Sequence, residues 1–133
     1  MQINFIKVHP IEVQTYFPEF YAPQKAFFEI NKDYKPIGFF GIKKVSDKVG
    51  EISVYFNEED RREITKGVAV ACLKFPFTLG FSKILISTEL QKIKRFLKKM
   101  TQFGVKYLTE HNNMHWFEME NQGASKYEVT NEF

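Results

Sequence analysis

The chain has 133 residues, of which 44% are hydrophobic and 17% aromatic, enough apolar material for the core of one domain. The net charge of +3 is too small to indicate nucleic-acid binding by itself, and no apolar run approaches the ~20 residues that span a bilayer. Cys72 is the only cysteine, which excludes a disulfide framework and a cysteine metal site. We therefore expect one cytoplasmic domain over residues 1–133, with a flexible polar tail over about 121–133.

The first half of the chain predicts a strand, a helix and three further strands. Apolar residues alternate over 3–7, and Pro10 suits the first turn of a helix. We assign the apolar side of that region to Ile11, Val13, Tyr16, Phe17 and Phe20. Residues 25–33, 36–45 and 50–56 are typical of strands separated by turns, and such close succession indicates an antiparallel meander.

The second half predicts two helices that alternate with strands. After a polar loop or loose helical turn at 57–63, Thr65 can cap a helix over 66–79, which Pro76 should bend. An apolar strand at 82–88 and an amphipathic helix over 90–100 follow, and Gly104 ends the second helix region. Residues 105–111 and 114–120 form a hairpin across Asn112-Asn113. The whole order predicts the α/β (α+β) class: a mixed, mostly antiparallel sheet with one β-α-β crossover and flanking helices.

The helix start at Lys66 is the most informative local feature. It follows an apolar strand and carries the small residues Gly67 and Ala69. Unpaired N–H groups and the positive end of the helix dipole favour an anion there. A phosphate-bearing cofactor is the commonest anion at such a turn, although Gly67 can also serve only close packing of the helix on the sheet.

From Ile3 to about Glu120 the order of elements resembles the GNAT superfamily of N-acetyltransferases. Members carry the motif Q/R-x-x-G-x-G/A after their fourth strand, and residues 64–69 are similar, with Ile64 in place of Arg or Gln. Residues 95–105 resemble a second family pattern, R-F-Y-E-K-L-G-F. Leu97 there matches the position of a tyrosine that acts as a general acid in many members, so this chain lacks that proton donor.

The resemblance implies acetyl-CoA as the cofactor and an amine, on a small molecule or a protein, as the acceptor. It implies pyrophosphate binding at Thr65, Lys66, Gly67, Val68 and Ala69, and binding of the pantetheine arm at Ser53, Val54, Tyr55 and Phe56. Family members often use a glutamate on the fourth strand as the base, so Glu51 is the first catalytic candidate and Glu89 the second. The alternative for both is a solvated carboxylate at a strand end.

Two other functions stay open at this point. Compact GNAT-like proteins with degenerate motifs occur among bacteriophage proteins, so the chain can instead be a non-catalytic structural or interaction protein, for example in a virion. The basic helix face at 92–99 would serve nucleic acid, but we favour a solvated surface because the aromatic residues fall on the apolar side. His9, His111 and His115 are isolated, and we expect no metal site and no membrane partner. The oligomeric state is left open.

Overall fold

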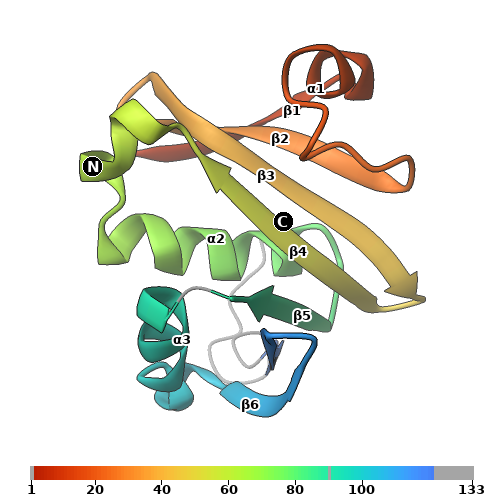
Figure 1. Cartoon of the computed structure of the whole chain (residues 1–133), viewed down its shortest axis with the longest axis vertical. Coiled ribbons are helices and arrows are strands. Elements are labelled where there is room, and N and C mark those ends of the chain that lie inside the picture. The colour runs from red at the N-terminus through yellow and green to blue at the C-terminus, as the bar shows by residue number, and fades with distance from the viewer. Residues whose placement is uncertain (1, 90, 122–133) are drawn as a thin grey trace.

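The computed structural model describes residues 2–89 and 91–121 (Figure 1). Within these residues, one sheet has the strand order β1-β2-β3-β4-β5-β7-β6. Its strands are β1 (Ile3–Val8), β2 (Lys25–Lys32), β3 (Lys35–Ser46), β4 (Val49–Phe56), β5 (Lys83–Thr88), β6 (Val105–His111) and β7 (Met114–Glu120). The helices are α1 (Pro10–Tyr16), α2 (Lys66–Thr78) and α3 (Gln91–Lys98), with 3₁₀ turns η1 (Glu58–Glu63) and η2 (Thr101–Phe103).

This architecture confirms the predicted fold class. Strands β4 and β5 pair in parallel across the α2 crossover, and the remaining strand pairs are antiparallel. Gly104 takes a left-handed φ of 91° where the second helix region ends, and Asn112 and Asn113 take φ values of 53° and 66° in the last hairpin turn. No helix among residues 2–89 and 91–121 has the length and apolarity that a membrane crossing requires. The tail predicted over about 121–133 lies outside the described residues, except for Asn121.

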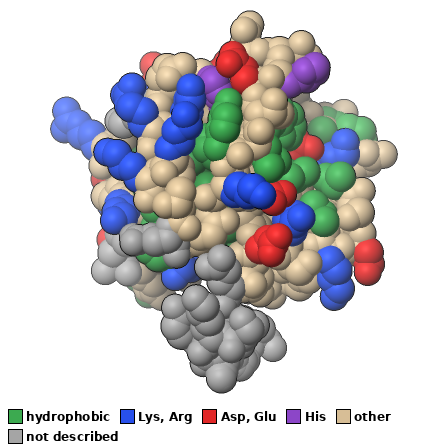
Figure 2. Space-filling view, turned by 90° about the horizontal axis from the view of Figure 1, so that it is seen from below, with side chains coloured by type: hydrophobic (Ala, Val, Ile, Leu, Met, Phe, Trp, Pro, Cys, Tyr) green, Lys and Arg blue, Asp and Glu red, His purple; other side chains and the backbone are tan. Residues whose placement is uncertain are grey.

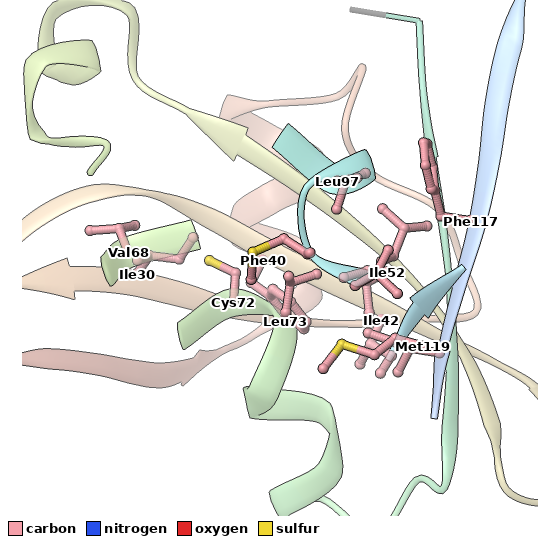
Figure 3. Close-up of a cluster of buried hydrophobic side chains, with 14 of the residues drawn as sticks. Ile30, Phe40, Ile42, Ile52, Val68, Cys72, Leu73, Leu97, Phe117 and Met119 are labelled. Atoms are coloured by element: carbon pink, nitrogen blue, oxygen red, sulfur yellow. The ribbon is translucent and has the colours of Figure 1, made fainter. Parts of the chain in front are cut away.

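The main core lies between the sheet and the helices α2 and α3 (Figure 3). Its buried side chains come from alternate positions on the strands, as the two-residue period requires, and include Phe40, Ile52, Ile84 and Phe117. Phe75 of α2 stacks on Phe5 with ring centroids 4.1 Å apart, and meets Phe28 and Phe40 edge-on. The α2 side of the sheet therefore carries much of the aromatic content of the chain.

The other face of the sheet is covered by α1 and the segment after it only at the β2–β4 end (Figure 1). The predicted apolar side of this region is wrong in part, because Ile11 is 60% and Tyr16 73% exposed. The helix ends at Tyr16, so its two turns bring only Val13 into full burial. Phe17 and Phe20 do pack on the sheet, against Phe39 and Phe27.

Helix α2 begins where its sequence signal predicts. The Thr65 hydroxyl accepts a hydrogen bond from Val68 N at 3.3 Å, which confirms the cap. Pro76 is buried in the last turn of α2, two residues before the helix ends, so little of the helix follows the hydrogen bond that its missing N–H interrupts. Cys72 faces the core, and burial raises the pKa of its thiol to about 12. Cys72 is therefore a packed thiol with little thiolate character.

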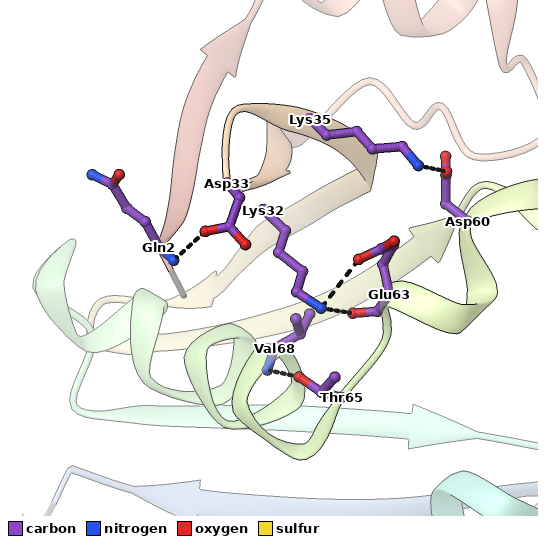
Figure 4. Close-up of polar contacts among 8 residues, drawn as sticks. All are labelled: Gln2, Lys32, Asp33, Lys35, Asp60, Glu63, Thr65 and Val68. Atoms are coloured by element: carbon purple, nitrogen blue, oxygen red, sulfur yellow. Dashed lines mark hydrogen bonds and ion pairs between the residues drawn. The ribbon is translucent and has the colours of Figure 1, made fainter.

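Ion pairs tie the β2–β3 turn to η1, the segment that leads into α2 (Figure 4). Lys35 Nζ lies 2.9 Å from Oδ1 of Asp60. The other carboxylate oxygen, Oδ2, accepts a hydrogen bond from Asn57 at 3.0 Å. Lys32 Nζ contacts both the carboxylate and the backbone carbonyl of Glu63, each at 3.2 Å. These contacts neutralise two of the acidic side chains that precede α2 and fix the approach of the chain to the helix.

The Asp60 contacts predict a pH-dependent stability. Hydrogen bonds from Lys35 and then Asn57 lower the pKa of Asp60 below its ordinary value of 3.8. A lowered carboxylate pKa contributes stability above the unfolded-state pKa, and that contribution disappears as the pH falls through the folded-state pKa. Asp60→Asn should therefore have a lower urea midpoint than the parent near pH ~7, and the difference should shrink below pH ~4. The exposed neighbour substitution Glu58→Gln should change the midpoint little at either pH; an Asp60→Asn difference that is equal at both pH values would contradict the assignment.

Candidate functional site

The strands β4 and β5 are hydrogen-bonded over a short parallel ladder and then separate. They pair only from Val49–Lys83 to Ile52–Ile86, although β4 continues to Phe56 and β5 to Thr88. Beyond the ladder β4 pairs with β3 alone and β5 with β7 alone, and the two strands diverge toward the side where η1 lies (Figure 1). The predicted pantetheine-binding residues Ser53, Val54, Tyr55 and Phe56 thus all border an opening in the sheet.

The backbone of this open stretch presents hydrogen-bonding groups to the gap. The carbonyl of Tyr55 points at Gly38 of β3, since a Cβ placed on Gly38 would overlap the Tyr55 oxygen. Successive residues of a strand point their N–H and C=O groups to opposite edges. Val54 and Phe56 therefore direct these groups away from β3, into the space that β5 has left.

The side chains of β4 divide between the two faces of the sheet. Glu51, Ser53 and Tyr55 lie on the α1 face, as the two-residue period predicts. The Tyr55 ring packs near Phe17 and Phe20, with centroids 5.5 and 6.1 Å apart, and it is half-exposed. The opening therefore has an aromatic wall on the face that α2 and α3 do not cover.

The start of α2 supplies the second part of the site. The N–H groups of Val68 and Ala69 bond to the hydroxyl and the carbonyl of Thr65. By helix geometry the N–H groups of Lys66 and Gly67, both exposed, have no acceptor within the helix. The side chain of Val68 lies in the core, so Thr65 and Val68 shape the helix start, while Lys66 and Gly67 present it to solvent.

An open hollow of about 400 Å³ lies between the start of α2 and helix α3. Apolar side chains and two lysines, Lys66 and Lys99, line it; the apolar ones are Ile64, Ala69, Ile93, Phe96 and Met100, and Thr65 completes the lining. Basic side chains gather on the side of the molecule where α3 lies (Figure 2). The hollow can therefore hold a molecule that is part apolar and part anionic.

The two candidate carboxylates do not come together. Glu51 is within the ladder, opposite Leu85, whereas exposed Glu89 follows the end of β5 and lies four residues beyond Leu85, or roughly 13 Å along the strand. Glu51 lies on the α1 face of the sheet, two residues before the opening begins at Ser53. Glu89 lies beyond the end of β5, at the other end of the opening. A single reacting group cannot use both carboxylates at once.

The positions that depart from the family patterns have structural explanations. Leu97 is 2% exposed and belongs to the core cluster with Ile52 and Phe117 (Figure 3). Ile64 contributes an apolar wall to the hollow. Tyr107 Oη lies 3.2 Å from Nδ1 of buried His115, which stands opposite Thr88 at the end of β5.

Sequence reasoning missed the contribution of α3 to the hollow. Ile93, Phe96 and Met100 were assigned to the apolar face of an amphipathic helix, and Lys99 to its solvated face. Their helical spacing does indicate one stripe that faces the protein. It does not indicate that part of the stripe borders an unfilled space, because that depends on how far α3 stands from the start of α2.

No model of a known protein family and no curated protein matches the chain. Solved structures do match. SpeG spermidine N-acetyltransferase from Vibrio cholerae superposes with a TM-score of 0.66 over 96% of this chain and 99% of that chain, at 9% identity. PseH N-acetyltransferase from Campylobacter jejuni, in complex with acetyl coenzyme A, gives 0.62 over 91% and 100% at 12% identity. A GNAT family acetyltransferase from Elizabethkingia anophelis with acetyl-CoA bound gives 0.61 over 90% and 98% at 14% identity.

The chain has the GNAT fold. This confirms the fold that the order of elements and residues 64–69 predict. The superpositions establish the fold, but at 9–14% identity they do not establish the reaction. The roles of individual residues therefore rest on this chain's own geometry.

Gly38 provides a test of the open stretch of β4. A side chain there would collide with the Tyr55 carbonyl and come within 2.9 Å of Phe56 Cα, both backbone atoms. Gly38→Ala should therefore displace the open end of β4 and lower the free energy of unfolding by about 1–3 kcal/mol. Gly67→Ala, at an exposed helical glycine, should cause no loss. Urea denaturation of both variants checks this, and equal stability of Gly38→Ala and the parent would refute the described close approach.

Proposed function

We propose that this GNAT-fold protein is an acyl-CoA-dependent N-acyltransferase that transfers an acetyl group from acetyl-CoA to an amine. The observation that carries the proposal is the opening between β4 and β5, whose rim leads through η1 to the exposed start of α2 and the adjoining hollow. Two structural neighbours with the same fold contain acetyl-CoA. The lysines and apolar side chains of the hollow, and the backbone groups at the opening, suit such a molecule in charge and polarity.

The pyrophosphate and the pantetheine arm of acetyl-CoA each have matching groups on the protein. The pyrophosphate would accept hydrogen bonds from the N–H groups of Lys66 and Gly67, with Lys66 and Lys99 as counter-charges. The amide-bearing pantetheine arm would pair with the backbone groups of Val54 and Phe56, much as a missing strand would. Apolar side chains of the hollow would pack against its hydrocarbon parts.

The transfer step requires a neutral amine and a polarised thioester carbonyl. An N–H group of the open stretch of β4 would donate to that carbonyl and stabilise the charge that develops as the amine attacks. The amine would approach from the α1 face, because α2 and α3 cover the other face. Glu51 lies on the α1 face beside the opening and would take up a proton from the amine, directly or through water.

The acceptor is an amine on a small molecule or a protein. Spermidine is a first compound to assay, since the neighbour SpeG is a spermidine N-acetyltransferase, and a lysine peptide is a second.

One observation favours the second function, a non-catalytic GNAT-fold protein such as a virion component: Leu97 lies in the core where a tyrosine acid is common. Cofactor binding without turnover on any amine would support that second function. Location in the cytoplasm, or in a virion, stays a prediction.

The start of α2 can be tested by calorimetry with acetyl-CoA. Gly67→Asp places a carboxylate among groups that would bind phosphate, whereas Gly67→Asn has nearly the same shape without the charge. Gly67 is exposed, and an acidic residue in a first helical turn favours the helix, so Gly67→Asp should fold; Gly67→Asn, of nearly the same shape, should fold too. We expect Gly67→Asp to weaken acetyl-CoA binding at least tenfold, or ~1.4 kcal/mol, and Gly67→Asn to weaken it less. Unchanged binding by a folded Gly67→Asp protein would remove the pyrophosphate site from α2.

The base can be identified by a comparison of Glu51→Gln with Glu89→Gln. Loss of a general base typically lowers the rate by roughly 10²–10⁴-fold. We expect that loss in kcat/KM for Glu51→Gln, with acetyl-CoA affinity retained, and little change for Glu89→Gln. The opposite ranking would assign the base to Glu89, and full activity of both variants across pH ~6–9 would exclude both.

A further inference from the structure

A lysine from the far side of β3 reaches the point where the opening between β4 and β5 begins. Lys25 is the first residue of β2, and its ammonium nitrogen donates a hydrogen bond to Ser53 Oγ at 3.0 Å. Ser53 is the first residue of β4 beyond the parallel ladder. The amine of Lys25 therefore stands at the vertex of the opening, on the α1 face, one residue away from the backbone groups of Val54.

The intervening strand is shaped to let Lys25 pass. Gly41 of β3 is the partner of Ser53, and it has no side chain to stand between Lys25 and Ser53. A Cβ on Gly41 would lie 3.4 Å from Lys25 Cδ and 3.1 Å from Ser53 Oγ. Phe20 closes the slot from above, with its ring centroid 4.9 Å from the Lys25 nitrogen. The backbone of Gly41, the ring of Phe20 and the hydroxyl of Ser53 thus hold the Lys25 side chain in an extended position.

The surroundings also favour a nucleophilic amine at Lys25. Partial burial lowers the pKa of Lys25, an effect that Glu51 opposes and Lys43 reinforces. A larger fraction of the amine is therefore neutral near physiological pH than for a lysine in water. Glu51 lies two residues before Ser53 on the same face and is a proton acceptor near the same point.

We propose that Lys25 is a self-acylation site, whose side-chain nitrogen takes the acyl group of a bound acyl-CoA. The inference rests on the proposed function, because the acyl donor is the one assigned to the opening. The ammonium first gives a proton to Glu51 or water; the neutral nitrogen then attacks the thioester carbon. A carbon–nitrogen bond forms and the carbon–sulfur bond breaks. The second proton of the amine goes to the departing thiolate, which leaves as coenzyme A thiol.

The product changes the vertex of the opening. An amide has no positive charge, so the cation above the Phe20 ring disappears. The added acyl group occupies the approach of an external amine on the α1 face. Acylation of Lys25 therefore lowers transfer to other amines.

To test self-acylation, the folded protein is incubated with acetyl-CoA and the acetylated lysines are mapped by mass spectrometry. Lys25 should gain an acetyl group to near stoichiometry while Lys44, whose side chain is 63% exposed, stays at background. A simple activated ester of acetate, which needs no binding site, should reverse that order. At an acetyl-CoA concentration below saturation, Gly67→Asp should slow labelling by acetyl-CoA at least tenfold and leave labelling by the ester unchanged, and urea-unfolded protein should show no preference for Lys25.

Two variants test the positioning of Lys25. Ser53→Ala removes the hydrogen-bond partner, and Gly41→Ala crowds the slot; each should slow acetylation of Lys25 several-fold, and Gly41→Ala should do so without loss of acetyl-CoA affinity. Lys25→Arg should remove the modified site and keep the charge. If acetyl-CoA binds by calorimetry and Lys25 is labelled no faster than Lys44, the self-acylation proposal is overturned and the proposed function stands. If acetyl-CoA does not bind, both are overturned.

Discussion

The ladder between β4 and β5 is the constraint on which the candidate site depends. Its pairs from Val49–Lys83 to Ile52–Ile86 join two halves of the sheet, and beyond them each strand keeps its bonds on the outer edge only. A ladder two residues longer would bond the backbone of Val54 to β5 and leave only the backbone groups of Phe56 for a ligand. Because α2 connects these same strands, its exposed start lies beside the opening that the end of the ladder creates.

The order of elements was predictable because local signals decide it. Thr65 before an apolar run starts α2, and Asn112-Asn113 between alternating segments makes a hairpin. The parallel pairing also follows from sequence, since a helix between two apolar strands crosses over the sheet. The polar run at 57–63 predicts a loop or one loose helical turn, and it forms a 3₁₀ turn that Asp60 and Glu63 tie to the β2–β3 turn.

The errors and omissions come from contacts between distant segments. The apolar side of α1 was overestimated at Ile11 and Tyr16, because their burial needs a longer helix than the seven residues that form. The placement of Lys25 beside Ser53 needs the register of three strands and the bare backbone of Gly41. No spacing in the sequence encodes that meeting. Likewise, the backbone groups of alternate residues on β4 point to opposite edges, but the sequence does not say which edge. Only the pairing of β3 with β4 shows that Val54 and Phe56, rather than Ser53 and Tyr55, face the opening.

The division of the sheet also bears on how the chain folds. Strands β1 to β4 are consecutive and each pairs with the next, and β5 to β7 pair among themselves after α2. The hairpin pairs β2–β3, β3–β4 and β6–β7 close short loops, whereas the pairs β4–β5 and β5–β7 close longer ones and cost more chain entropy. Neither half contains the opening by itself, because the opening is made when the halves dock. A chain with one half folded has no place for a ligand of the opening, so such a ligand draws the folding equilibrium toward the fully docked state.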